Sequence, residues 1–209
     1  MLTVAKGYDD VVRARDRREW LTDSPGKVEL ADSKALLLGA GAIGGLIATR
    51  LAAFDVGVTT VRRTPGADEL GPDQWRAKLG SYDWVILAVP ATPETDGMIG
   101  AAELAAMKPS ATLVNIARGG IVDDAALAVA LREKRIAAAG LDVFEGEPAV
   151  HPDLLSVPNV VLTPHQAGLA ASSKVNAAVR AVNNALAVLA GRLPADAINP
   201  IAMTSGADT

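Results

Sequence analysis

Three glycines spaced as G-x-G-x-x-G constrain this chain more than any other feature. They follow the apolar run Ala35–Leu38 and open the helical stretch Ala42–Ala53. Glycines at this spacing let the chain turn sharply after a strand, approach a pyrophosphate closely and pack the next helix on the strand. The order therefore predicts a dinucleotide-binding unit, and a glycine loop that serves packing alone is the alternative. The cofactor-binding candidates at this turn are Gly39, Gly41, Ala42, Ile43 and Gly44.

Short apolar runs alternate with helical stretches along the rest of the chain. Runs that are apolar throughout are typical of parallel strands covered on both faces, so we predict a Rossmann-like, doubly wound α/β fold. The expected strands are Ala35–Leu38, Val56–Val61, Trp84–Val89, Thr112–Ile116, Ala137–Val143 and Val160–Leu162. The expected helices are Tyr8–Trp20, Ala42–Ala53, Ala101–Met107, Asp124–Lys134 and Leu169–Leu189. A single cofactor-binding domain at 31–168 would lie between an N-terminal helix and linker (1–30, with turn residues at Thr22–Lys27) and a C-terminal helix and tail (169–209).

The composition excludes several function classes. The absence of cysteine rules out disulfides, thiolate metal sites and a cysteine nucleophile, and two histidines give a metal site little to build on. A net charge of -4 and 3% aromatic residues offer nucleic acid neither a basic field nor a stacking surface. The N-terminus lacks a basic segment followed by an apolar core, and the longest apolar stretch is too short to cross a bilayer. We expect a cytoplasmic protein that binds small molecules or protein, with no nucleic-acid or membrane partner.

The end of the second expected strand indicates the type of cofactor. A carboxylate at this place would bind the ribose diol of NAD, but the chain has Arg62, Arg63 and Thr64 there. Two guanidinium groups and a hydroxyl are donors suited to a 2'-phosphate. The sequence therefore predicts NADP(H) in preference to NAD(H), unless the two arginines are only solvated surface.

Five motifs follow the glycine turn. In sequence letters they are DWVILAVPATPET (83–95), MKP (107–109), NIARGGIVD (115–123), GLDVFEGEP (140–148) and PNVVLTPH (158–165). Together they resemble the D-isomer-specific 2-hydroxyacid dehydrogenase family. The resemblance runs from about Val11 to Pro200 and implies an oxidoreductase that uses a nicotinamide cofactor.

The resemblance also implies catalytic roles for three residues. Arg118 would hold the substrate carboxylate and activate the carbonyl, His165 would donate or accept the proton, and Glu147 would pair with the histidine. A guanidinium matches a carboxylate in two places, and an imidazole exchanges protons near neutral pH. Taken singly, the three could be an ion partner, a loop cap and a solvated turn. The further cofactor neighbours that the resemblance implies are Val89, Pro90, Thr95, Ala117 and Asp142, the last facing the nicotinamide carboxamide.

Only 38 residues precede the glycine turn, so the resemblance implies a truncated form that lacks most of the N-terminal substrate lobe. An open cleft would weaken electrostatic catalysis and orient hydride transfer poorly. A second subunit, a separate protein or a bulky substrate would close it, and a fragment or relic is the remaining alternative. We expect a homodimer, because Val11, Val12 and Trp20 would expose apolar area on a monomer.

Three functions follow from these observations. The leading hypothesis is an NADP-dependent oxidoreductase that moves a hydride between the nicotinamide and a carbonyl or hydroxyl carbon of a small molecule. The second is a non-redox isomerase, lyase or cyclase of a biosynthetic pathway, with His165 and Glu147 as proton-transfer groups. The third is a non-catalytic nucleotide-binding module. The remaining histidine, His151, is interpreted as a surface loop residue, and the residues interpreted as packing groups are Met98, Met107, Trp20, Trp75 and Trp84.

Overall fold

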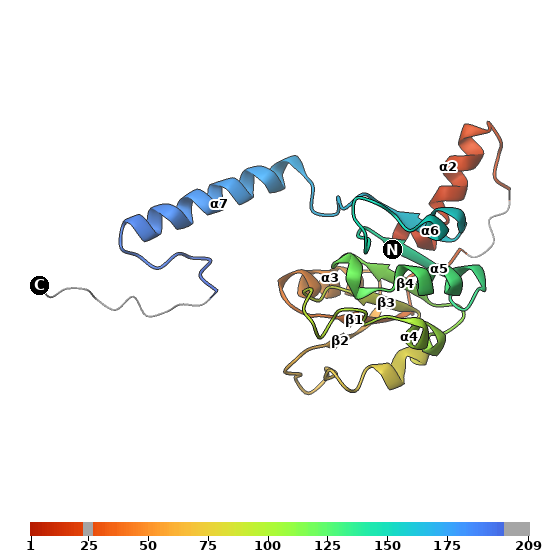
Figure 1. The fold of residues 1–209 in the computed structure, drawn as a ribbon, viewed down its shortest axis with the longest axis horizontal. Helices are drawn as coiled ribbons and strands as arrows, with labels where there is room; N and C mark the ends of the chain where they lie inside the picture. Colours follow the sequence, from red (N-terminus) through yellow and green to blue (C-terminus); the bar gives the residue numbers. More distant parts are fainter. Residues whose placement is uncertain (23–26, 199–209) are drawn as a thin grey trace, which may run out of the picture. The chain divides into compact units, whose positions relative to one another are not determined.

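The computed structural model describes residues 1–22 and 27–198 and contains a six-stranded parallel sheet (Figure 1). Residues 23–26 of the predicted linker lie outside the described residues. The strands, in the order β2-β1-β3-β4-β5-β6, confirm the predicted fold class. Their bounds are β1 Lys34–Leu38, β2 Gly57–Val61, β3 Trp84–Leu87, β4 Thr112–Asn115, β5 Ala138–Leu141 and β6 Val160–Leu162.

The sheet has a hydrophobic core on each face, because successive strand residues point to opposite sides. In β1, Leu36 and Leu38 join one buried cluster, and Ala35 and Leu37 join the other. The same division recurs in β3, where Val85 and Leu87 face the first cluster and Trp84 and Ile86 the second. Runs that are apolar throughout are therefore needed, since both faces of these central strands are covered.

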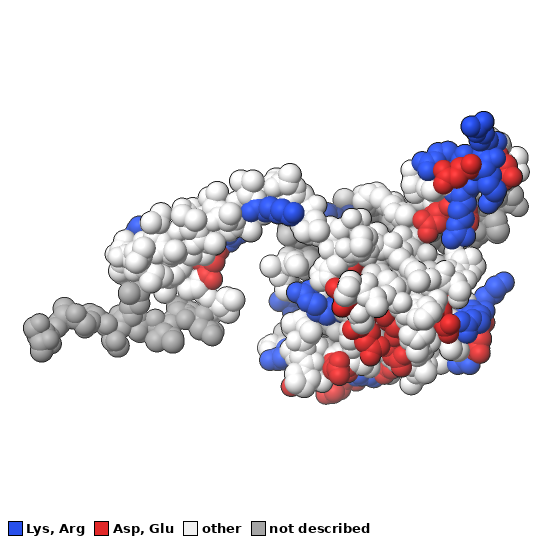
Figure 2. All heavy atoms as spheres, turned by 45° about the horizontal axis from the view of Figure 1, so that its top comes forward, with Lys and Arg blue, Asp and Glu red and all other residues white. Residues whose placement is uncertain are grey.

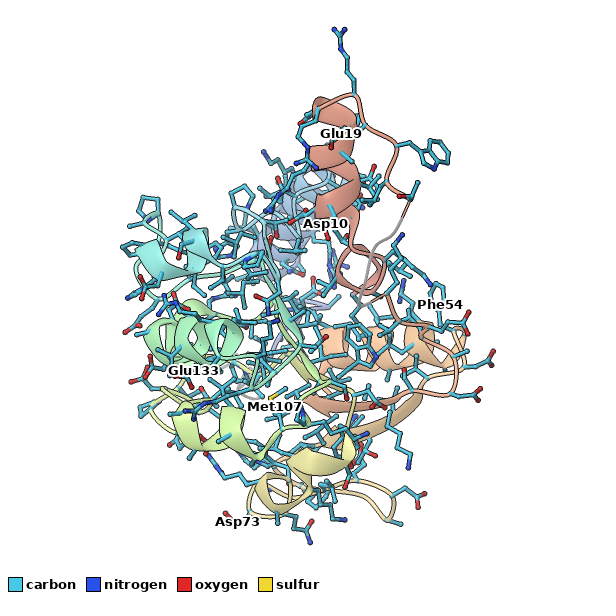
Figure 3. All side chains as sticks on the ribbon, turned by 90° about the vertical axis from the view of Figure 1, so that its right-hand side faces the viewer. Asp10, Glu19, Phe54, Asp73, Met107 and Glu133 are labelled. Atoms are coloured by element: carbon cyan, nitrogen blue, oxygen red, sulfur yellow. The ribbon has the colours of Figure 1, made fainter. Side chains whose placement is uncertain are left out.

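Helices cover both faces of the sheet (Figure 1). The helices that the sequence predicted are α2 Tyr8–Asp16, α3 Ala42–Ala52, α4 Ala101–Ala106, α5 Asp124–Arg132 and α7 Ala171–Leu189. Asp123 caps α5, since its carboxylate accepts a hydrogen bond from the Ala126 amide at 2.8 Å. Met107, which directly follows α4, is buried in the core, as expected of a packing residue (Figure 3). The short helices that the sequence did not indicate are α1 Leu2–Ala5, η1 Arg76–Ser81, η2 Gly119–Ile121 and α6 Pro152–Ser156.

The N-terminal helix α2 is shorter than the pattern predicted. It ends at Asp16, and Arg18 then adopts a left-handed backbone conformation with φ 59°. Trp20 is therefore outside the helix and 88% exposed, so its interpretation as a packing residue is wrong, whereas Trp75 and Trp84 are buried. Figure 2 shows both signs of charge mixed over this segment rather than a continuous basic face.

Among the described residues, 166–198 belong to a second compact unit. Its α7 has no buried residue, and Arg180 and Asn184 of this helix both bind the carboxylate of Asp196. The helix ends where Gly191 takes a positive φ of 69°. Among the described residues, no helix is both long and apolar enough to cross a membrane.

Candidate active site

The three glycines of the turn have different physical requirements. Gly39 has φ 95°, and a side chain there would place its Cβ 2.5 Å from the carbonyl oxygen of Ala88. At Gly44 a Cβ would lie 1.9 Å from the Gly39 carbonyl oxygen, so this glycine allows α3 to pack against the end of β1. At Gly41 a Cβ would meet nothing within 4 Å. The open space at Gly41, at the N-terminus of α3, is where a pyrophosphate fits a turn of this kind.

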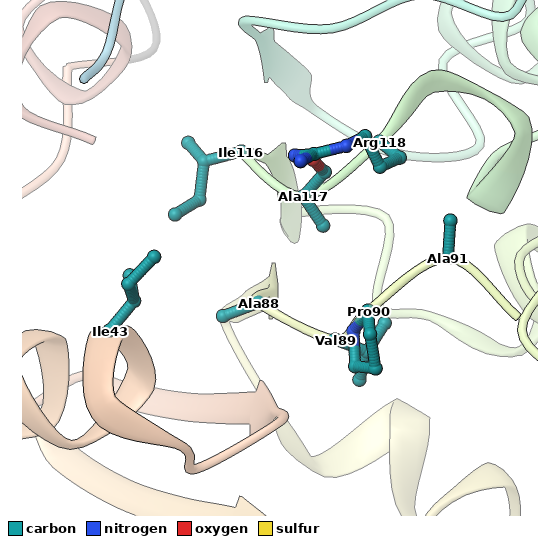
Figure 4. Close-up of a pocket in the computed structure, with 8 residues that line it drawn as sticks. All are labelled: Ile43, Ala88, Val89, Pro90, Ala91, Ile116, Ala117 and Arg118. Atoms are coloured by element: carbon teal, nitrogen blue, oxygen red, sulfur yellow. The ribbon is translucent and has the colours of Figure 1, made fainter. Parts of the chain in front are cut away.

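A pocket of about 440 Å³ lies beside the glycine turn (Figure 4). It is built from the residues that follow β1, β3 and β4, at the carboxyl edge of the sheet. The chain leaves β1 for β2 on one side and later returns to β3 on the other, and ligands of open α/β sheets bind at such a switch point. The lining is apolar apart from one guanidinium. The residues that form it are Ile43, Ala88, Val89, Pro90, Ala91, Ile116, Ala117 and Arg118.

The loop after β3 is shaped by Thr95, which is buried although it is polar. Its hydroxyl donates to the Pro90 carbonyl at 2.7 Å and accepts from the Thr92 amide at 2.8 Å. With both functions of the hydroxyl used inside the loop, Thr95 fixes the backbone that carries Val89 and Pro90 along the pocket.

Arg118 stands at the end of a tight turn that begins in β4. The buried side chain of Asn115 spans this turn, since its Oδ1 accepts from the Ala117 amide at 3.0 Å and its Nδ2 donates to the Arg118 carbonyl at 2.9 Å. The next residue must be glycine, because a Cβ at Gly119 would lie 1.8 Å from the Phe144 carbonyl oxygen. Asn115 fixes the backbone of Arg118, while the guanidinium is exposed toward the pocket and donates to the Ala117 carbonyl at 2.6 Å.

His165 and Glu147 form a direct pair. Nδ1 of His165 lies 2.7 Å from Oε2 of Glu147, and Oε1 of the same carboxylate accepts from the Phe144 amide at 2.9 Å. The hydrogen bond from His165 lowers the pKa of Glu147 below its usual value, and the Phe144 amide and the charge of Arg118 act in the same direction. Glu147 is therefore a carboxylate at neutral pH, and it fixes the ring so that Nε2 is the nitrogen left to exchange a proton with a substrate.

The backbone of His165 is tied to Asp142. Its amide donates to the Asp142 carbonyl at 2.8 Å, and the residue has a positive φ of 49°. The buried Asp142 carboxylate accepts from the Thr163 hydroxyl at 2.5 Å. The Thr163 carbonyl in turn accepts from the His165 amide at 3.0 Å, so Thr163 connects the residue expected beside the nicotinamide with the residue expected to transfer the proton.

An ion pair that the sequence did not suggest lies at the end of β2. Arg62 is bound by Glu69, with 2.8 Å between Nε and Oε1. Arg63 and Thr64 are exposed, as Arg62 is. No sequence signal pointed to Glu69, because its approach depends on how residues 62–70 fold back on β2.

The predicted site residues thus fall into two groups along one edge of the sheet. Arg118, Glu147 and His165 follow β4, β5 and β6 on one side of the glycine turn, and 62–64 follow β2 on the other. His151 lies apart from both, at the N-terminus of α6, where its Nδ1 accepts from the Asp153 amide at 3.3 Å. The residues of the site that sequence reasoning missed are Glu69, Asn115 and Thr163; the last two lie inside the motifs quoted above, within three residues of a site residue.

The parallel sheet, the glycine turn and the pocket at the switch point define a dinucleotide-binding domain. Residues 1–167 match the D-isomer specific 2-hydroxyacid dehydrogenase, NAD binding domain. The chain belongs to this family, as the resemblance of its motifs predicted.

Three similar proteins illustrate the match. A glyoxylate reductase of Pyrococcus furiosus is 42% identical over 168 residues, which are 78% of this chain and 50% of that protein. The structure of a protein from Thermus thermophilus superposes with a TM-score of 0.85 at 34% sequence identity. The match covers 95% of this chain and 65% of the Thermus thermophilus chain. The structure of an NADPH-dependent glyoxylate/hydroxypyruvate reductase from Sinorhizobium meliloti, in complex with NADP and malonate, has a TM-score of 0.81 at 34% sequence identity. That match covers 90% of this chain and 60% of the reductase chain. This chain spans about half the length of the glyoxylate reductases that it matches.

Proposed function

We propose that this protein is an NADP(H)-dependent oxidoreductase of the D-2-hydroxyacid dehydrogenase type, which interconverts a small 2-oxo acid and its 2-hydroxy acid. The observation that carries the proposal is the 2.7 Å contact between His165 and Glu147, at the same sheet edge as the glycine turn and Arg118. A proton-transfer group, its carboxylate partner and a carboxylate-binding cation are the parts that this chemistry needs.

Each side chain has a defined task in the reduction. Arg118 binds the substrate carboxylate and polarises the adjacent carbonyl, because its guanidinium offers parallel donors. His165 donates a proton from Nε2 to the carbonyl oxygen, and Glu147 stabilises the imidazolium before the transfer. The nicotinamide cofactor, when bound, supplies the hydride that adds to the carbonyl carbon. In the oxidation direction His165 takes the proton back.

Three features of the chain suit this cofactor. The open space at Gly41 and the N-terminus of α3 suit the pyrophosphate, and Ile43 and the loop Val89–Pro90 offer apolar contact along the pocket. Arg62, Arg63 and Thr64 suit a 2'-phosphate better than a ribose diol, and they supply the reason to prefer NADP(H). An NADP complex of the S. meliloti reductase supports the same choice.

The similar proteins suggest a small substrate. Glyoxylate reductases are among them, and the S. meliloti structure contains malonate, which is a carboxylate like the proposed substrate class. Glyoxylate is therefore the first substrate to test.

We expect the purified chain to oxidise NADPH in the presence of glyoxylate, with a measurable fall in NADPH absorbance. Arg118→Gln should raise KM for glyoxylate by about tenfold or more, because a charge-assisted bidentate contact is lost. Arg192→Gln, which removes an exposed cation from the second unit, is the matched control and should leave KM unchanged. Tight NADPH binding without oxidation of NADPH by any 2-oxo acid would contradict the proposal.

We also propose that the protein is a cytoplasmic homodimer. Of the three residues expected to expose apolar area, Val11 is 40% and Trp20 88% exposed, whereas Val12 is half-buried. Tyr8 of α2 adds a further side chain that is 56% exposed. A two-fold interface would bury this apolar area on both subunits. Light scattering at micromolar concentration should give the mass of two chains, and Val11→Asp should shift the population toward one chain. A monomer that persists at all accessible concentrations would rule the dimer out.

A further inference from the structure

The segment after β2 folds back beside the strand that it leaves. The Arg62 amide donates to the Leu70 carbonyl at 2.9 Å, and the Leu70 amide donates to the Thr60 carbonyl at 2.8 Å. Leu70 itself is buried beside Val61. Glu69, one residue earlier, is thereby held against the strand end where a cofactor phosphate is proposed to bind.

The Glu69 carboxylate is bound by three donors. Oε1 accepts from the Thr60 hydroxyl at 2.8 Å and pairs with Nε of Arg62 at 2.8 Å, while Oε2 accepts from the Gly66 amide at 2.9 Å. The Gly66 amide is the largest cause of a lowered pKa of Glu69, followed by Thr60 and Arg62. The Glu69 side chain is 24% exposed, and these contacts place its carboxylate beside the Arg62 guanidinium.

The neighbouring Arg63 has a different environment. Among the described residues no ion pair is formed by Arg63, and its guanidinium is exposed. Its charge is felt by Glu94 in the loop after β3, whose pKa is lowered chiefly by the Thr92 hydroxyl and to a smaller degree by Arg63. Arg63 therefore has no carboxylate bound to it as Arg62 has, and its guanidinium interacts with Glu94 only through the longer-range effect of its charge.

We propose that Glu69 tunes the choice of cofactor, because it binds Arg62 and leaves Arg63 as the cation that a 2'-phosphate meets. This inference rests on the proposed NADP(H) function and adds a positioning residue to it. Glu69 does not contact the cofactor in this scheme; it acts through Arg62. Two adjacent arginines thus contribute unequally, and the negative charge of Glu69 limits how strongly the phosphate is preferred.

The test compares the dissociation constants of NADPH, NADH and 2',5'-ADP by titration calorimetry for three variants of the whole chain. Arg63→Gln should weaken NADPH and 2',5'-ADP by about tenfold or more, since a charge-assisted contact is lost, while NADH stays within about twofold. Arg62→Gln should weaken NADPH by no more than about threefold, because in this scheme Arg62 is bound to Glu69 and does not contact the phosphate, so only the longer-range effect of its exposed charge is lost. Glu69→Gln keeps an acceptor for the Gly66 amide and should tighten NADPH by about threefold, with NADH unchanged.

The pair Arg135 and Glu133 provides matched controls, because it has the same chemistry at 2.6 Å near the opposite edge of the sheet. Arg135→Gln and Glu133→Gln should change none of the three dissociation constants. The role proposed for Glu69 would be overturned if Arg62→Gln and Arg63→Gln lost affinity for NADPH equally, or if Glu69→Gln bound both NADPH and NADH more weakly. Either result would leave the proposed NADP(H) function standing. A wild-type chain that binds NADH as tightly as NADPH would overturn the proposed cofactor choice together with it.

Discussion

Replacing His165 with asparagine should lower kcat for glyoxylate reduction by about 10²- to 10⁴-fold, the usual contribution of a positioned acid or base. Asparagine is the informative replacement because His165 has φ 49°, a conformation that asparagine adopts more readily than other non-glycine residues. The backbone bond to the Asp142 carbonyl is then preserved, while proton exchange at Nε2 is lost. Stopped-flow measurement of NADPH oxidation gives kcat, and calorimetry gives the dissociation constant of NADPH, which should stay within about twofold because the imidazole is proposed to act on the substrate.

Glu147→Gln distinguishes a catalytic pair from a structural one. The lowered pKa of Glu147 keeps the carboxylate ionised at acidic pH, so its contribution to the pair is present above the ordinary glutamate pKa and is lost as the pH falls through the lowered value. Glutamine carries no charge, so acidification through the lowered pKa of Glu147 should destabilise the wild type more than Glu147→Gln, by a small amount because the pair is partly exposed. The kcat of the variant should also fall, because the imidazole loses the carboxylate that orients its ring. His165→Asn with wild-type kcat would remove His165 from the role of proton donor, and Glu147→Gln with wild-type kcat would leave Glu147 a structural partner only.

The fold was predictable because the strands are buried on both faces. Runs such as Leu36–Leu38 and Trp84–Leu87 contain no polar residue, and their alternation with helical stretches is typical of a parallel sheet between two layers of helices. The short helices α1, η1, η2 and α6 span six residues or fewer. An apolar period of 3.6 is not recognisable over so few positions. The six-residue α4 was predicted all the same, because its sequence AAELAA consists of strong helix formers.

The candidate site was predictable to a different extent on its two sides. His165 and Glu147 were expected together because family motifs and the ends of neighbouring strands agreed, and the 2.7 Å contact fits that expectation. The ion pair of Arg62 with Glu69 was not foreseen, because it depends on the backbone hydrogen bonds that fold the loop back to Leu70. Side chains that follow strands are placed by the sheet, whereas side chains within loops are placed by contacts that the local sequence does not encode.

Gly44→Ala should destabilise the protein by about 3 kcal/mol, at the upper end of the range for an overpacked interior site. The added Cβ would lie 1.9 Å from the Gly39 carbonyl oxygen, and both partners are backbone, so α3 must move away from the end of β1. Thermal unfolding should show a fall in Tm of about 6 to 12 °C for a chain of this size. Gly45→Ala is the matched control, because it lies in the same helix and a Cβ there meets nothing within 4 Å. This control should be neutral or more stable by up to about 1 kcal/mol.

Gly41→Ala then separates the fold from the cofactor site. Gly41 has φ -72°, which alanine adopts without strain, and its Cβ would meet nothing within 4 Å, so Tm should remain within about 2 °C of the wild type. The same methyl group would stand where a pyrophosphate approaches the N-terminus of α3, and NADPH binding should weaken by about tenfold or more. If Gly41→Ala binds NADPH as the wild type does, the glycine turn serves packing alone, because the only glycines that the fold itself requires there are Gly39 and Gly44.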